Sequence, residues 1–167
     1  MILDIREEVP ILLEYVRNRV TSHIEKTKDE SLPPVGMIDF GFEFGQSNWV
    51  ALAFDTRPNA EPDGEWTRDI DQFLLERPNW PIWADLPEDS QVYFIDLHGE
   101  KIDVMDDPDE IICSIVGEML KHVLLTAREQ GFFANLVRTD KCELGVENIE
   151  GFYGWPIYED RGKENMA

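Results

Sequence analysis

The clearest constraint on the fold is a stretch, residues 37–44, in which every second residue is large and apolar. These apolar positions are Ile38, Phe40, Phe42 and Phe44. Successive residues of a strand point to opposite faces, so this period of two predicts a strand with one buried face. Residues 49–55 have the pattern of a second strand, and residues 45–48 have the composition of a hairpin turn. We therefore expect the two strands to pair in an antiparallel fashion.

An amphipathic helix is predicted over residues 9–26. Apolar residues recur there at steps of three and four, which builds one apolar stripe. Pro10 falls in the first turn, where its missing N–H has no helical partner. A helix that began at Leu3 would instead be kinked at Pro10. The segment 28–34 ends in two prolines and is expected to terminate the helix.

A second and more apolar helix is predicted over residues 107–130. Asp107 stands at the expected cap, Pro108 at the first helical position, and Glu110 completes the capping pattern. Gly131 is the expected left-handed stop. Because its apolar face is wide, we expect this helix to lie at the centre of the core.

The remaining segments have shorter patterns. We predict a short helix over residues 67–76, an ordered loop over 77–90, strands over 92–97 and 101–105, and an edge strand over 143–147. Together these elements predict a single α+β domain over residues 1–167, with residues 161–167 as a frayed tail. Its sheet is expected to be antiparallel, with four or five strands and two main helices packed on one face.

Acidic residues outnumber basic ones 35 to 15, and the excess is concentrated in one third of the chain. Residues 55–110 contain 17 acidic and four basic residues, whereas residues 111–139 contain two acidic and three basic residues. A field of this sign repels nucleic acid and anionic membranes, and it attracts a basic protein or a cation. We therefore expect no nucleic-acid or membrane partner. The nine Phe and five Trp indicate a folded domain, because acidic disordered chains are poor in aromatic residues.

The sequence pattern favours a cytoplasmic protein. Charges at positions 4, 6, 7 and 8 interrupt the apolar stretch that a signal peptide needs, and the longest apolar runs are far shorter than a membrane span. Cys113 and Cys142 lack the close spacing of a metal or redox pair. We interpret them as two free thiols in a reducing compartment.

The sequence contains no recognisable catalytic, cofactor or metal motif. Its three histidines are isolated, and no glycine-rich phosphate loop is present. We therefore expect no catalytic residues, no cofactor and no metal. The alternative is a carboxylate-dependent or metal-assisted hydrolase, because hard cations bind oxygen ligands. Such an enzyme would use a carboxylate cluster such as Asp103, Asp106 and Asp109. A calcium or magnesium ion could draw its ligands from the wider run Asp103, Asp106, Asp107, Asp109 and Glu110. The helix start already accounts for the last three of these acids.

Three tryptophans fall inside the acidic third of the chain: Trp66, Trp80 and Trp83. They have two interpretations. As core residues they would anchor a long loop. As surface residues they would supply the buried anchor for a partner that the surrounding acids attract, since Trp is favoured at interaction hot spots.

The elements between residues 9 and 130 follow a characteristic order. An N-terminal helix precedes the strands Ile38-Asp-Phe-Gly-Phe-Glu-Phe44 and Trp49-Val-Ala-Leu-Ala-Phe-Asp55, which are followed by an acidic, tryptophan-bearing loop and a core helix. In this order the chain resembles the small acidic cytoplasmic immunity proteins of bacterial toxin systems. The resemblance implies a non-enzymatic inhibitor that binds one toxin domain, often a basic nuclease.

We accordingly expect a non-enzymatic binding protein with a basic protein partner, which the resemblance implies to be a toxin domain. The residues expected at the contact are Asp55, Glu61, Asp63, Glu65, Trp66, Trp80, Trp83, Asp85, Glu88 and Asp89. A further alternative is a regulatory or structural subunit. Such a subunit would form a stable homo-oligomer or co-purify with a metabolic partner.

Overall fold

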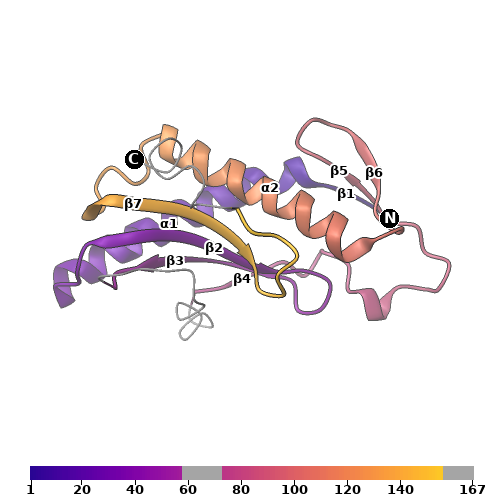
Figure 1. The fold of residues 1–167 in the computed structure, drawn as a ribbon, viewed down its shortest axis with the longest axis horizontal. Coiled ribbons are helices and arrows are strands. Elements are labelled where there is room, and N and C mark those ends of the chain that lie inside the picture. The colour runs from indigo at the N-terminus through magenta and orange to yellow at the C-terminus, as the bar shows by residue number, and fades with distance from the viewer. Residues whose placement is uncertain (58–72, 156–167) are drawn as a thin grey trace.

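A computed structural model describes residues 1–57 and 73–155. Its elements are, in chain order, β1 (Ile2–Asp4), η1 (Ile5–Glu7), α1 (Glu8–Glu30), β2 (Val35–Glu43), β3 (Trp49–Asp55), β4 (Leu75–Glu76), η3 (Trp83–Asp85), β5 (Tyr93–Ile95), β6 (Lys101–Asp103), α2 (Pro108–Glu129) and β7 (Arg138–Asn148). The strands form a four-stranded sheet of order β4-β3-β2-β7 and a three-stranded sheet of order β1-β5-β6 (Figure 1). The fold class is α+β, as predicted.

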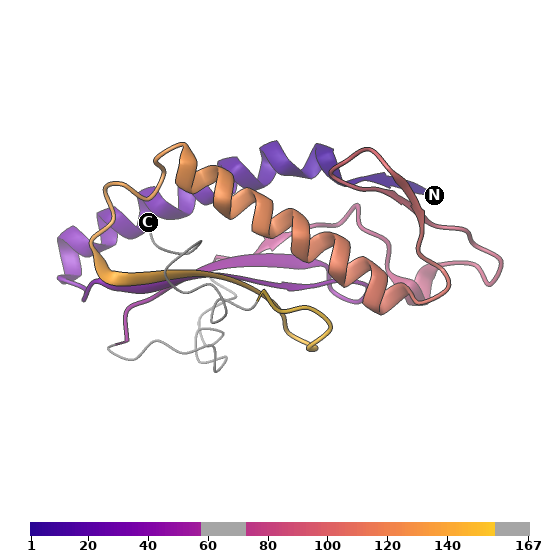
Figure 2. The same cartoon turned by 45° about the horizontal axis from the view of Figure 1, so that its top comes forward.

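Both long helices lie on the same side of the four-stranded sheet (Figure 2). The alternating apolar residues of β2 face them, and Ile38, Phe40 and Phe42 are each 0 % exposed. Tyr15 of α1 stacks on Phe40, with the ring centroids 6.3 Å apart. The core therefore fills the space between this sheet face and the two helices.

The prediction of an antiparallel sheet is only partly correct. Strands β2 and β3 form the expected antiparallel hairpin, but β7 pairs with β2 in parallel. The physical reason is that α2 carries the chain back along the sheet, so β7 begins at the end where β2 begins (Figure 1). The predicted edge strand 143–147 is part of β7, which is longer and does lie at the sheet edge.

The two strands predicted at 92–97 and 101–105 form a separate sheet. As β5 and β6 they pair in the expected antiparallel manner. Their third partner is β1, which runs parallel to β5 and was not predicted from the sequence. A strand of three residues is too short to give a period-two pattern, so only this pairing reveals it.

The short helix predicted over residues 67–76 is wrong at its end. Leu75 and Glu76 form β4, which pairs antiparallel with Val50 and Trp49 at the edge of the larger sheet. Residues 67–72 lie outside the described residues. The last turn of a helix leaves backbone carbonyl groups without hydrogen-bond partners. Pairing with an open sheet edge supplies such partners to the backbone of Leu75 and Glu76.

Helix α1 begins near the predicted residue and extends four residues beyond the predicted end. Pro10 lies in its first turn, as expected. The helix stops at Ser31, which has a left-handed φ of 52° and donates its N–H to the Thr27 carbonyl at 3.0 Å. Side chains of α1 also complete the edge of β3: Tyr15 Oη accepts from Leu52 N at 2.9 Å, and Arg19 Nε donates to Leu52 O at 3.2 Å.

Helix α2 agrees with its prediction at both ends. Asp107 is the N-cap and accepts from Glu110 N at 3.5 Å, and Pro108 occupies the first helical position. Gly131 adopts the left-handed conformation, with a φ of 77°. Its buried face includes Val116, Met119, Leu120, Val123 and Leu124.

Candidate functional site

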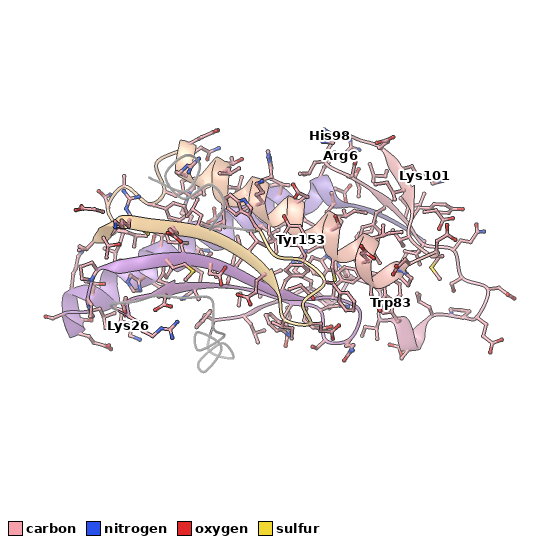
Figure 3. All side chains as sticks on the ribbon, in the orientation of Figure 1. Arg6, Lys26, Trp83, His98, Lys101 and Tyr153 are labelled. Carbon is pink, nitrogen blue, oxygen red and sulfur yellow. The ribbon has the colours of Figure 1, made fainter. Side chains whose placement is uncertain are left out.

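The backbone of residues 85–110 lies at one end of the molecule, on the right in Figure 1, and most of the acidic side chains in this segment are exposed. They belong to the loop around η3, the three-stranded sheet and the first turn of α2, and this surface is termed the acidic end. The exposed members are Asp85, Glu88, Asp89, Glu100, Asp103, Asp106, Asp107, Asp109 and Glu110. The cations at this end include Arg6 and Lys101 (Figure 3). Arg6 is ion-paired with Asp4 at 2.6 Å, and Lys101 lies over the Tyr93 ring at 4.1 Å.

Trp80 is a core residue. Its side chain is 2 % exposed and stacks on Phe44, with the ring centroids 4.9 Å apart. The indole Nε1 donates to Glu8 Oε2 at 3.2 Å, and the Trp80 carbonyl accepts from Asn48 Nδ2 at 2.9 Å. Trp80 therefore anchors the loop in the core. The expectation that it contacts a partner is wrong, because its side chain is buried.

Trp83 is half-buried and packs against the β2–β3 hairpin. Its backbone N–H donates to Gly45 O at 3.0 Å, and a Cβ added at Gly45 would lie 2.3 Å from the indole Nε1. Gly45 also has a φ of 100°, so both its backbone and this contact require glycine. The indole is thereby fixed to the hairpin and keeps only part of its surface accessible.

The hairpin under Trp83 is itself held by a buried carboxylate. Glu43 is 3 % exposed and accepts from the N–H groups of Gln46, Ser47 and Asn48 at 3.1, 2.6 and 3.0 Å. The Ser47 hydroxyl also donates to it at 2.5 Å. The hairpin tip is therefore a rigid support for the loop that follows β4.

The other expected contact residues fall into three groups. Asp55 is buried at the end of β3, where Arg57 Nη2 lies 2.6 Å from its carboxylate, so it does not belong to an exposed contact surface. Asp85, Glu88 and Asp89 are exposed and belong to the acidic end. The remaining predicted residues, Glu61, Asp63, Glu65 and Trp66, lie outside the described residues.

A buried ion pair joins the start of α1 to the loop after β4. Arg77 donates through Nε to Glu8 Oε2 at 2.7 Å and through Nη2 to Glu8 Oε1 at 2.9 Å. The two side chains are only 11 % and 8 % exposed. Sequence reasoning missed this pair, because its members are 69 residues apart. The sequence feature that could have indicated the pair is Arg77 itself, one of only four basic residues in the acidic segment 55–110.

The sheet face turned away from the helices contains a buried carboxyl group. Asp39 of β2 is 2 % exposed and lies opposite Ala53 of β3 and Gly145 of β7. As a carboxylate, its Oδ2 would receive no hydrogen bond from the described residues. Burial, together with the neighbouring carboxylate of Glu147, raises the pKa of Asp39 well above its usual range. We therefore expect Asp39 to be protonated and to donate to Glu147.

Replacing Asp39 by asparagine is expected to stabilise the protein at high pH and to have little effect near pH 4. A raised folded-state pKa means that the folded wild type binds more protons than the unfolded chain. Its stability therefore falls as pH rises from about 4, the usual carboxyl pKa, toward the raised value. The neutral amide avoids this loss.

Urea unfolding of wild type and Asp39→Asn across this pH range measures the difference. Asp140→Asn, at an exposed carboxylate of β7, is the control. A stability difference that does not change with pH would show that Asp39 is ionised in the folded state.

Two carboxylates of the alternative metal site have local structural roles. Asp103 Oδ1 accepts from Met105 N at 3.0 Å, and Asp107 caps α2. Within residues 1–57 and 73–155, no group of three or more His, Cys, Asp or Glu residues is placed to hold a metal ion. The arrangement of Asp103, Asp106 and Asp109 therefore gives no geometric support to metal-assisted hydrolysis.

Both cysteines are free and buried. Burial raises the pKa of the Cys113 thiol to about 12 and that of the Cys142 thiol to about 11. Thiols with such values stay protonated near neutral pH and are poor nucleophiles. The two residues serve as small core side chains.

Comparisons with protein-family models, with curated proteins and with solved structures found no match. In the described part of the chain, no helix is long and apolar enough to cross a membrane.

Proposed function

We propose that this chain binds a basic protein through its acidic end, and that the partner is a toxin domain that the chain neutralises. The proposal is carried by the exposed acids of residues 85–110, whose backbone lies at one end of the molecule (Figure 1). Arg6 and Lys101, the cations seen among them, are already engaged with Asp4 and the Tyr93 ring. Such a surface attracts a positively charged protein and speeds its approach.

The toxin part of the proposal comes from the resemblance to immunity proteins. An acidic surface suits an inhibitor that covers the basic substrate-binding surface of a nuclease. The regulatory-subunit alternative shares the same surface chemistry. The identity of the partner separates them, because a regulatory subunit would bind a metabolic enzyme, whereas an immunity protein abolishes the activity of its toxin.

Affinity capture with matched charge variants tests the proposal. One variant combines Asp85→Asn, Glu88→Gln and Asp89→Asn at the acidic end. The control combines Glu25→Gln, Asp29→Asn and Glu129→Gln, exposed acids at the C-terminal ends of α1 and α2. Both lose the same charge.

We expect wild type and control to retain a basic protein at low salt, and the acidic-end variant to retain less of it. Wild type should also inhibit the toxic activity of the captured protein. An acidic partner, or equal capture by all three proteins, would contradict the acidic-end proposal. A basic partner without toxic activity would contradict only the proposal that the partner is a toxin.

A further inference from the structure

The loop after β7 presents two large apolar side chains to solvent. Ile149 is 48 % exposed and Phe152 is 44 % exposed. Both ribbon views place this loop beside the β2–β3 hairpin and the first turns of α2 (Figures 1 and 2). The hydrogen bond from Gln46 Nε2 to Glu150 Oε1, at 3.2 Å, ties the loop to that hairpin. The loop and η3 of the acidic end therefore contact the same hairpin, because Trp83 N donates to Gly45 O at 3.0 Å.

The exposure of these side chains does not result from a loose backbone. Asn148 Oδ1 accepts from the N–H groups of Glu150 and Phe152 at 3.1 and 3.2 Å, and Asn148 N donates to Tyr153 O at 2.9 Å. Beyond the loop, Trp155 N donates to the β7 backbone at 2.9 Å. Hydrogen bonds at both ends of the loop therefore hold its backbone in place.

Tyr153 fixes the loop to α2 as well (Figure 3). Its ring lies 2.3 Å from where a Cβ of Gly117 would be, which explains a glycine in the middle of the core helix. The Tyr153 hydroxyl donates to Glu118 Oε1 at 2.9 Å. The loop is thus a rigid projection supported by β7, the hairpin and α2.

The electrostatic surroundings of the loop are negative. Glu150 is an exposed acid within the loop itself, and the Tyr153 hydroxyl donates to the carboxylate of Glu118 on α2. Self-association through this surface would bring two acidic surfaces together in a chain whose net charge is −20. A basic partner meets no such repulsion.

We propose that the Ile149–Phe152 loop is the apolar anchor of the partner-binding surface, and that it receives a basic protein segment carrying large apolar side chains. The inference rests on the proposed function and adds the contact element to it. It assigns to this loop the role that the sequence suggested for Trp80, which is buried. Aromatic side chains, Phe included, are enriched at protein–protein interfaces.

Two synthetic peptides of equal charge serve as probes: one alternates Lys and Leu, and the other alternates Lys and Ser. Fluorescence anisotropy measures their binding to wild type and to an Ile149→Ser, Phe152→Ser variant. We expect wild type to prefer the Lys/Leu peptide by about tenfold or more, because partial burial of two large side chains corresponds to a factor of that order. The preference should fall to about one in the variant.

The control is Ile11→Ser with Val137→Ser, which removes exposed apolar residues from α1 and from the segment before β7. It should keep the wild-type preference. Phe152→Ser alone, expected to reduce the preference partly, replaces the double variant if that protein melts at a lower temperature. The anchor role of the loop would be contradicted if wild type bound both peptides equally, or if the loop variants kept the preference. Either result would leave the acidic-end proposal unaffected. If neither peptide binds wild type, both proposals fail.

Discussion

Replacing Trp80 by alanine is expected to lower the free energy of unfolding by about 3–5 kcal/mol. The substitution empties a core site against Phe44 and removes the indole N–H that donates to the buried Glu8 carboxylate. Urea unfolding followed by circular dichroism measures the loss. Trp80→Phe is the matched variant: it keeps most of the ring packing and loses the hydrogen bond, so we expect a loss of about 1–3 kcal/mol.

A loss of less than about 1 kcal/mol for Trp80→Ala would contradict the core position of this residue, because surface substitutions lie in that range. It would instead support the interpretation of Trp80 as a surface residue that contacts a partner. The two interpretations thus give opposite stability results for one substitution.

Replacing Arg77 by alanine is expected to cost about 3–5 kcal/mol, because it leaves the Glu8 carboxylate buried without its cationic partner. Both side chains of the pair are almost fully buried. The double variant Arg77→Ala, Glu8→Gln should lose less than Arg77→Ala alone, since the uncompensated charge is then absent. The measurement is again the free energy of unfolding in urea.

The control for this ion pair is Arg17→Ala. Arg17 lies 3.7 Å from Glu14, and both side chains are more than half exposed. Such surface pairs contribute about 0–1 kcal/mol. Equal losses for Arg17→Ala and Arg77→Ala would show that the Arg77–Glu8 pair is solvated and does not anchor the loop.

Local patterns predicted the parts of the fold that local physics determines. The period of two in residues 37–44 identified β2, and the cap at Asp107 with the stop at Gly131 identified α2. The parallel pairing of β7 depends on where α2 returns the chain, and β4 depends on an open edge of β3. Such pairings join distant segments, so patterns within one segment do not reveal them.

The sequence predicted part of the candidate site as well. The excess of acids marked the segment that forms the acidic end, because net charge is visible in composition. The burial of Trp80 was not visible, since it depends on Phe44 and on the start of α1. The exposure of Phe152 was also hidden, because an aromatic residue in a glycine-rich segment has the same pattern whether it packs inward or faces solvent.

The association rate constant with the captured partner shows whether the acidic end steers a basic protein toward this chain. Stopped-flow measurements would compare wild type, the Asp85, Glu88 and Asp89 variant, and the Glu25, Asp29 and Glu129 control between 0.1 M and 1 M salt. The Debye length falls over this range from about 10 Å to about 3 Å, so electrostatic steering is largely screened at the upper limit. We expect wild type and control to associate rapidly at low salt, the acidic-end variant to associate several-fold more slowly, and all three to converge at high salt. Equal rates for all three proteins at low salt would contradict the claim.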